Sequence, residues 1–294
     1  DVEYVYELFA LLKSSQSTLV SQFSDNEEQF EAVSNQLKKT IDYCVTAFLK
    51  QSKQRVASSE ELIKYFVRLC QIFPDVVPFS VQHQNIVLDH LITFGDIKRT
   101  DELYAKLLSL HKDRHLKLTA ATFATMLKSC KTKKGGHDYE IHKERAQRIL
   151  NDMKQLNIPF DMIFCTALME FYVFAGETAK ASETFKVMLD NTVMDSYAVA
   201  RSFNILLKKL QLDQHLNATQ RQEVVRSVID MLQDMKKCES PYLTLTLYNT
   251  ILSGLTKASS RHAFTVLSMM MEDEVLFDKY TYTTLVELFS GPLA

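Results

Sequence analysis

Apolar residues recur along most of this chain at intervals of three and four positions, in the order i, i+3, i+4 and i+7. This spacing places apolar side chains on one face of an α-helix. Strictly alternating runs of Val, Ile and Thr, which would indicate β-strands, are missing from the sequence. Glycine and proline are scarce, at six and five residues. The pattern therefore predicts an all-α protein.

The helical pattern itself repeats, with a phrase that returns about every 34 to 45 residues. Each phrase has a first helix, a short turn, and a second helix that closes on Met or Leu. The clearest example runs from Ile163 to Gly176 and continues with Ala181, Phe185 and Met188. The first-helix phrase returns at Ser202, Leu247 and Thr281. Self-similarity at this period predicts stacked helical hairpins, each too small to bury its apolar face alone.

Aligning the units on this phrase predicts five repeats and a truncated sixth, at 81–119, 120–161, 162–199, 200–244, 245–278 and 279–294. The less regular residues 1–80 are predicted to form a helical N-terminal cap of degenerate repeats. Its helices are expected at 2–12, 25–50 and 59–73, with Asp25 and Ser58 as caps.

Three glycines have predicted roles in this arrangement. Gly95 and Gly176 fall at the turn between two helices, where a positive φ is needed. Gly254 falls inside a first helix, where the missing side chain lets the next helix approach closely. Extra length in the longer repeats is expected between their two helices, at 131–142 and 211–222.

Composition narrows the class of protein. The chain is 46% hydrophobic and 24% charged, which is ordinary for a globular protein, and no apolar run approaches the roughly 20 residues that span a membrane. A net charge of −2 disfavours a protein that grips nucleic acid mainly through phosphates. A locally basic groove remains open, with candidate residues Lys128, Lys131, Lys133 and Lys134. Because the chain starts at Asp1 and its last repeat breaks off, we expect a fragment whose targeting peptide lies outside it.

Candidate catalytic chemistry is absent from the sequence. The five cysteines include no C-x-x-C pair and are expected to be reduced thiols in the core, which favours cytosol, nucleus or mitochondrial matrix. His111 and His115 are four residues apart, but no third metal ligand has a suitable spacing. Phosphate-loop, G-x-S-x-G and H-E-x-x-H motifs are missing. We therefore expect no enzyme activity, no metal and no cofactor.

The repeat phrases resemble the pentatricopeptide repeat family. The unit at Met162 matches at its Ala175-Gly176 turn and at Ala181, Phe185 and Met188. Residues 153–161 resemble the ending of a unit, and residues 248–254 are the best match to a first helix. The tetratricopeptide family is a near neighbour, but this chain lacks its Trp. The resemblance covers roughly residues 81–290 and implies a right-handed α-solenoid of stacked helix-turn-helix repeats.

The resemblance also implies single-stranded RNA as a partner, with one base read per repeat. The fifth and last residues of a unit would touch the base edge, and the second residue would stack on the base. The fifth positions are Asn85, Ala124, Thr166, Asn204, Asn249 and Thr283. The last positions are Thr119, Asp161, Val199, Thr244 and Asp278. The second positions are Gln82, Ala121, Ile163, Arg201, Thr246 and Tyr280.

Several of these positions lack the expected chemistry. Ala124 and Val199 offer no polar group, whereas Asn249 with Asp278 matches a familiar pair that favours uracil. Ile163, Arg201 and Tyr280 have side chains suited to stacking. An Asn near a helix start can instead be a simple cap. The implied RNA-binding set is Asn85, Thr119, Asp161, Ile163, Thr166, Arg201, Asn204, Thr244, Asn249, Asp278, Tyr280 and Thr283.

Three functions remain open at this point. The resemblance, in its divergent form, implies a sequence-selective RNA-binding protein of the mitochondrial matrix, acting in mRNA or rRNA stability, processing or translation. The net charge favours a protein-binding scaffold, such as a subunit of a mitochondrial ribosome or translational-activator complex. The third is the repeat region of an RNA-processing enzyme whose catalytic domain lies elsewhere. A basic repeat surface would favour RNA, and an apolar or acidic one would favour protein.

Overall fold

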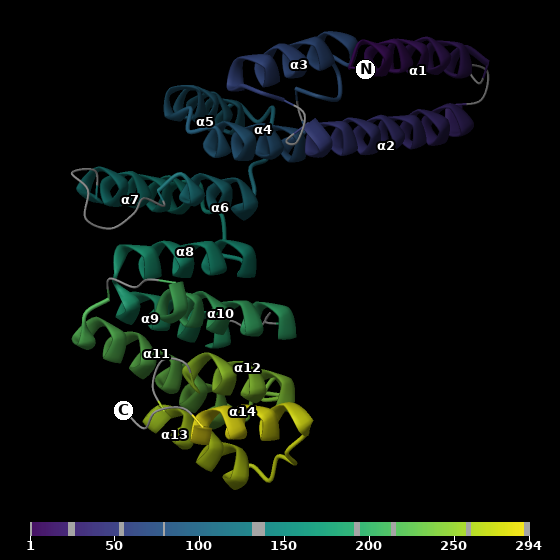
Figure 1. Cartoon of the computed structure of the whole chain (residues 1–294). Helices are drawn as coiled ribbons and strands as arrows, with labels where there is room; N and C mark the ends of the chain where they lie inside the picture. Colours follow the sequence, from purple (N-terminus) through teal and green to yellow (C-terminus); the bar gives the residue numbers. More distant parts are fainter. Residues whose placement is uncertain are drawn as a thin grey trace. The chain divides into compact units, whose positions relative to one another are not determined.

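The computed structural model describes residues 2–22, 27–52, 56–78, 80–130, 139–190, 195–212, 216–256 and 260–290. Within these ranges the chain forms 14 α-helices and no β-strand (Figure 1), so the all-α prediction is confirmed. The helices divide into two compact units, residues 1–129 and 130–294. The predicted repeat boundaries stay predictions.

The first unit contains six helices: α1 (Val2–Gln22), α2 (Glu27–Ser52), α3 (Ser59–Ile72), α4 (Val81–Thr93), α5 (Ile97–Lys112) and α6 (Ala120–Lys128). Helices α2, α4 and α6 pack one against the next, and α3 and α5 both pack against α4. Helix α1 packs against α2 and α3. The core between them is apolar and includes the fully buried Ile41, Leu49, Leu62 and Leu91.

The second unit contains eight helices: α7 (Tyr139–Gln155), α8 (Met162–Ala175), α9 (Thr178–Asp190), α10 (Ser196–Leu212), α11 (Ala218–Lys237), α12 (Leu245–Thr256), α13 (Ser260–Glu272) and α14 (Lys279–Ser290). Helices α8, α10, α12 and α14 pack in succession (Figure 1). Each of α8, α10 and α12 also packs on the helix that follows it in the chain. The stacked hairpins predicted from the repeating phrase are therefore present in this unit.

Most first helices of the predicted repeats begin where the sequence pattern places them. Helices α4, α6, α8, α12 and α14 start at Val81, Ala120, Met162, Leu245 and Lys279. Helix α10 is different, because it starts at Ser196, one turn before the predicted Ala200. The side chain of Asp195 accepts a hydrogen bond from the Ala198 backbone N–H at 2.7 Å, which caps this earlier start.

The N-terminal helices extend beyond some of the predicted ranges. Helix α1 continues to Gln22 instead of ending at residue 12. Ser14 and Thr18 donate to backbone carbonyls of the preceding turn, so their polarity does not end the helix. Helices α2 and α3 agree with the predicted 25–50 and 59–73 to within two residues. Ser58 caps α3 as predicted, and Asp25 lies outside the described residues.

One predicted insertion is largely helical. Helix α10 runs to Leu212 and α11 begins at Ala218, so the extra length at 211–222 mostly lengthens the two helices. Asn217 and Gln220 form a capping box at the start of α11, which explains why a polar segment is helical. In the other insertion, residues 131–138 lie outside the described part of the chain.

The glycine predictions are confirmed, with one correction. Gly95 and Gly176 have φ values of 73° and 75°. A Cβ built on Gly254 would lie 2.7 Å from Cδ2 of Leu207. Leu207 belongs to α10, so the helix nearest to Gly254 is the preceding first helix instead of the next one.

The thiols are mostly placed as expected. Cys130 and Cys165 are buried, Cys44 and Cys70 are half-buried, and Cys238 is the exposed exception at the end of α11. Burial raises the pKa of Cys70 and of Cys165 to about 11, so both are protonated and unreactive at neutral pH. None of the described helices has the length and apolar character needed to cross a membrane.

Candidate nucleic-acid interface

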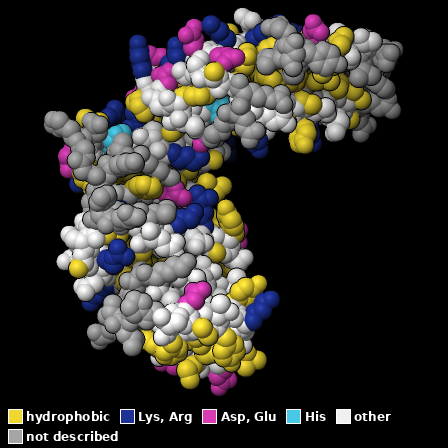
Figure 2. All heavy atoms as spheres, viewed as in Figure 1, with side chains coloured by type: hydrophobic (Ala, Val, Ile, Leu, Met, Phe, Trp, Pro, Cys, Tyr) yellow, Lys and Arg dark blue, Asp and Glu magenta, His cyan; other side chains and the backbone are white. Residues whose placement is uncertain are grey.

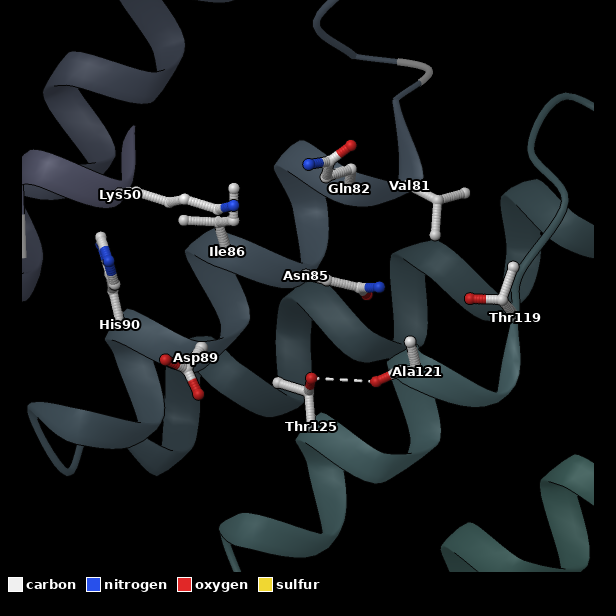
Figure 3. Close-up of a pocket in the computed structure, with 10 residues that line it drawn as sticks. All are labelled: Lys50, Val81, Gln82, Asn85, Ile86, Asp89, His90, Thr119, Ala121 and Thr125. Atoms are coloured by element: carbon white, nitrogen blue, oxygen red, sulfur yellow. Dashed lines mark hydrogen bonds between the residues drawn. The ribbon is translucent and has the colours of Figure 1, made fainter. Parts of the chain in front are cut away.

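An open pocket of about 590 Å³ lies on the first unit, between the starts of α4 and α6. Its wall includes Gln82 and Asn85 from α4, with Thr119 and Ala121 from the start of α6. Figure 3 shows Asn85 and Thr119 pointing into the same space. These four are the second, fifth and last residues of the unit 81–119 and the second residue of the next unit. The structure thus brings together the positions that the sequence predicts to contact one base.

The pocket contains polar groups without partners. The Oδ1 atom of Asn85 is buried and accepts no hydrogen bond from the described residues. Thr119 is the N-cap residue of α6, yet its side chain makes no capping hydrogen bond. Thr125, in contrast, donates to the Ala121 carbonyl at 2.9 Å. A buried unpaired acceptor costs about 1–3 kcal/mol. A ligand that donates a hydrogen bond to Asn85 Oδ1 would remove this cost.

Two cations on the first helices are held in ion pairs. At the pocket edge, Lys128 Nζ lies 2.7 Å from Asp89 Oδ1. In the second unit, Arg201 Nη2 lies 2.9 Å from Glu170 Oε1. Carboxylates on the preceding first helix therefore neutralise both cations. Lys128, one candidate for a locally basic groove, is thus paired with a carboxylate, and the other candidates, Lys131, Lys133 and Lys134, lie outside the described residues.

Asn249 and Asp278 form a connected group with Thr281. Asn249 Nδ2 donates to Asp278 Oδ1 at 3.0 Å, and Thr281 Oγ1 donates to Asn249 Oδ1 at 2.7 Å. Asp278 also accepts from the Thr281 backbone N–H at 2.9 Å, which caps α14 and holds the pKa of Asp278 below its usual value. The Asn249 amide keeps one N–H and one lone pair unused, in an orientation fixed by its neighbours.

Other predicted positions at the helix starts have structural roles. Asp161 accepts from the Phe164 N–H at 2.8 Å, and Thr244 accepts from the Leu247 N–H at 3.3 Å. Both are therefore N-caps. Thr166 donates to the Met162 carbonyl at 2.7 Å and is only 4% exposed, so its hydroxyl lies below the surface. Thr283 donates to the Lys279 carbonyl and is exposed.

The predicted stacking residues differ in whether another side chain holds them. Ile163 is 57% exposed, and Tyr280 is 63% exposed with Lys279 Nζ 5.0 Å from its ring centroid. Arg201 is held by Glu170, as described above. Ile163 and Tyr280 therefore offer apolar area at the surface that a base can cover.

Helix α10 carries residues that the sequence alignment missed. Counted from its start at Ser196, the second and fifth residues are Tyr197 and Ala200. Tyr197 is 66% exposed. The predicted Arg201 and the exposed Asn204 lie one turn further along the same helix. The signal for the earlier start was Asp195, a strong N-cap residue directly before the helix.

Metal chemistry finds no support in the described residues, where no three His, Cys, Asp or Glu side chains are grouped to hold an ion. His111 accepts from the Leu118 backbone N–H at 3.0 Å through Nδ1, which ties the end of α5 to the following turn. Its role there is structural.

Comparison of the chain with known protein families and solved structures indicates which family it resembles. A model of the pentatricopeptide repeat domain matches residues 148–209, which contain α8, α9 and parts of α7 and α10. Among solved structures, the chain is similar to the pentatricopeptide repeat protein PPR10 from maize, at 12% identity and a TM-score of 0.21. This match covers 93% of the chain and 56% of the maize chain, so the chain spans little more than half of that relative.

That TM-score is too low to inform the arrangement of helices. The comparison with curated proteins found no match. The domain match is the stronger finding, because it falls on the unit whose turn and second helix carry the repeat phrase most clearly. It supports a pentatricopeptide repeat protein, and stacked hairpins surround the matched segment.

Proposed function

We propose that this protein binds single-stranded RNA along the first helices of its repeats and reads individual bases there. The observation that carries the proposal is the pocket between α4 and α6, where the second, fifth and last positions of one repeat meet the second position of the next. A pocket between two first helices can admit the edge of an unpaired base, which a duplex keeps stacked and paired.

The polar groups support reading of a base edge. In the pocket, Asn85 offers an unpaired buried acceptor and Thr119 an uncommitted hydroxyl. In the second unit, Asp278 and Thr281 hold the Asn249 amide with one donor and one acceptor unused. An amide held in a fixed orientation presents its donor and acceptor at set positions, so it binds a matching base edge with less loss of entropy than a freely rotating amide.

We further propose that the protein works in the mitochondrial matrix, on the stability, processing or translation of mRNA or rRNA. The divergent form of the repeats supports this proposal. Imaging of the tagged full-length protein with a matrix marker tests the location. Sequencing of RNA cross-linked to the protein in cells tests the target, and only nuclear or cytosolic transcripts in that pool would contradict it.

Binding in solution tests the proposed function directly. Fluorescence anisotropy should show tighter binding to single-stranded RNA than to the same sequence as duplex RNA, because only the single strand presents free base edges. Asn85→Ala should weaken that binding. Asn151→Ala is a matched control, because Asn151 is an exposed asparagine on α7 outside the predicted positions. Equal affinity for single strand and duplex would contradict base reading.

A protein-binding scaffold is the second candidate, favoured by the ion pairs Lys128–Asp89 and Arg201–Glu170. Each pair engages a cation that could otherwise attract a phosphate. Under this alternative the purified chain binds no RNA from a randomised pool at low salt. A co-purifying protein that withstands high salt would then identify the partner class.

A further inference from the structure

Asp42 of α2 lies outside the predicted repeats, yet it is joined to the start of α4. Ser80 Oγ donates to Asp42 Oδ1 at 3.1 Å. His83 Nε2 lies 3.2 Å from the Asp42 carbonyl oxygen and 3.3 Å from Oδ1. A carbonyl oxygen can only accept a hydrogen bond, so Nε2 carries the proton. Two residues at the start of α4 therefore hold Asp42 in one orientation.

The same arrangement occurs around Asn249 in the second unit. Asn249 hydrogen-bonds Asp278, the N-cap residue of α14, and Thr281, the third residue of that helix. Asp42 likewise contacts the N-cap residue and the third residue of α4. In each case the two helices pack against each other. Asp42 thus occupies on α2 the place that Asn249, a predicted fifth position, occupies on α12.

Helix α2 also borders the pocket that contains Asn85. Lys50 of α2 lines the wall of that pocket (Figure 3), and α2 packs directly on α4. Asp42 precedes Lys50 by eight residues, about two turns of the helix. Its side chain is 39% exposed, so a ligand can reach it. The Asp42 carboxylate is therefore accessible on the helix next to the proposed base-reading helix α4.

The Asp42 carboxylate accepts hydrogen bonds and has capacity left. Oδ1 accepts from Ser80, and no described residue donates to Oδ2. An ionised carboxylate binds most strongly to two adjacent donors. The Watson–Crick edge of guanine presents N1–H and the N2 amino group side by side. Adenine, cytosine and uracil each present one donor group next to an acceptor, so guanine is the complementary base.

Charges of both signs occur on the unit that carries Asp42. Figure 2 shows Lys and Arg side chains among Asp and Glu side chains on the visible face of the first unit. The described residues in that view do not form a continuous acidic patch. A field of a single negative sign, which would repel phosphates, is therefore missing from that face.

Building on the proposed function, we propose that Asp42 reads a guanine base of single-stranded RNA, at the nucleotide adjacent to the one that Asn85 reads. Consecutive repeats read consecutive bases in that function, and α2 directly precedes α4 in the packing order. The two carboxylate oxygens accept from N1–H and from the N2 amino group. Ser80 and His83 are positioning residues, because they hold the carboxylate and do not touch the base.

Selection from a randomised single-stranded RNA pool tests the proposal. Wild type should enrich guanine next to the nucleotide whose preference Asn85→Ala removes. Asp42→Asn should lower that guanine preference at least about tenfold and keep the others, because an amide has only one accepting atom. Asp230→Asn is the matched control, since Asp230 is an exposed aspartate on the second helix α11. Thermal melts show whether each variant is folded.

A modified base tests the contact at the level of single atoms. Inosine keeps the N1–H of guanine and lacks the N2 amino group. Inosine at the selected guanine should weaken binding to wild type by about tenfold, the scale of one hydrogen bond to a charged group. The same change should weaken binding to Asp42→Asn by less. This comparison also holds if Asp42→Asn proves unstable, because the loss is measured first on wild type.

The outcomes separate this inference from the function on which it rests. Identical selections by wild type and Asp42→Asn, while Asn85→Ala loses one nucleotide, would overturn base reading by Asp42 and leave the proposed function standing. An Asp42-dependent preference for another base, or at a nucleotide that is not adjacent to that of Asn85, would overturn it as well. Equal binding of the guanine and inosine RNAs by wild type would do the same. If wild type enriches no sequence, both the inference and the proposed function fail.

Discussion

Asn249 and Asp278 are joined by a hydrogen bond of 3.0 Å from the amide Nδ2 to the carboxylate Oδ1, across the length of one repeat. Asp278 is also the N-cap of α14, and Thr281 closes the group by donating to both side chains. One residue thus starts a helix and orients the amide of the preceding first helix. In this repeat the folding role and the proposed recognition role share the same atoms.

Replacing Asp278 should separate these two roles. Asp278→Ala should lower the melting temperature through the lost cap and reduce selectivity for one nucleotide, because the Asn249 amide becomes free to rotate. Asn217→Ala is the control, since Asn217 caps α11 and lies outside the implied RNA-binding set. Both variants should lose stability in thermal melts. Altered RNA preference in Asn217→Ala, or unaltered preference in Asp278→Ala, would contradict the assignment.

Asn85 should matter for binding and should not support the fold. Because its Oδ1 is buried without a partner, Asn85→Ala removes an unmet acceptor, so the free energy of unfolding should not fall and could rise by up to about 1–3 kcal/mol. RNA affinity should fall by about 1–3 kcal/mol, the scale of one specific base contact. Chemical denaturation and anisotropy on the same sample check both values. A large loss of stability with unchanged affinity would assign Asn85 to the fold instead.

The Asp89–Lys128 pair predicts a gain of affinity. Asp89→Asn should release Lys128 for phosphate contact and remove a repulsive charge, so RNA binding should tighten. The slope of log affinity against log salt should steepen by about 0.7, the value for one neutralised phosphate on a single strand. Stability should change little, because exposed ion pairs contribute at most about 1 kcal/mol. An unchanged salt slope would show that RNA does not pass Lys128.

Gly254 should resist substitution by alanine. Alanine normally stabilises a helix interior by about 0.8–1.0 kcal/mol over glycine. Here the new Cβ would lie 2.7 Å from Leu207, and overpacking costs about 1–3 kcal/mol, so we expect a net loss of about 1 kcal/mol. In a Leu207→Ala background the contact is gone and Gly254→Ala should stabilise. Denaturation of the four proteins in this cycle measures the coupling, and additive effects would contradict it.

His83 should make the first unit sensitive to acid. It is fully buried, and burial lowers its pKa despite Asp42 Oδ1 at 3.3 Å. The pKa of His in an unfolded chain is about 6.5. Below that pH the unfolded chain therefore binds a proton that His83 of the folded chain does not bind as readily. Stability should therefore be retained above pH ~6.5 and fall as the pH drops below it. His83→Gln should flatten the melting temperature between pH 7 and 5, and an equal slope in both proteins would sink this explanation.

The fold was largely predictable because helical periodicity and caps are local signals. Five first helices begin at the expected residues, and Gly95 and Gly176 take the expected positive φ. The start of α10 was missed because the alignment followed the apolar phrase around Phe203, whereas the cap Asp195 adds a turn before it. The repeated apolar pattern determines which face of a helix packs into the core. The N-cap residue determines where the helix begins.

The site was less predictable, because it depends on which side chains pair across repeats. The positions around Asn85 and Thr119 do meet in one pocket, as the repeat register implies. The ion pairs of Lys128 and Arg201 could not be read from the sequence, because each joins residues more than thirty positions apart. Nor does sequence show that Thr166 is buried, since its burial depends on the packing of neighbouring helices.

Selection from a randomised single-stranded RNA pool tests the central claim most directly. The wild-type chain, Asn85→Ala and Asn249→Ala should be compared, with thermal melts to show that each is folded. We predict that wild type enriches a defined sequence, and that each variant loses preference at one nucleotide, a different one for each. Enrichment of no sequence by wild type, or identical selections by all three proteins, would contradict base recognition at Asn85 and Asn249.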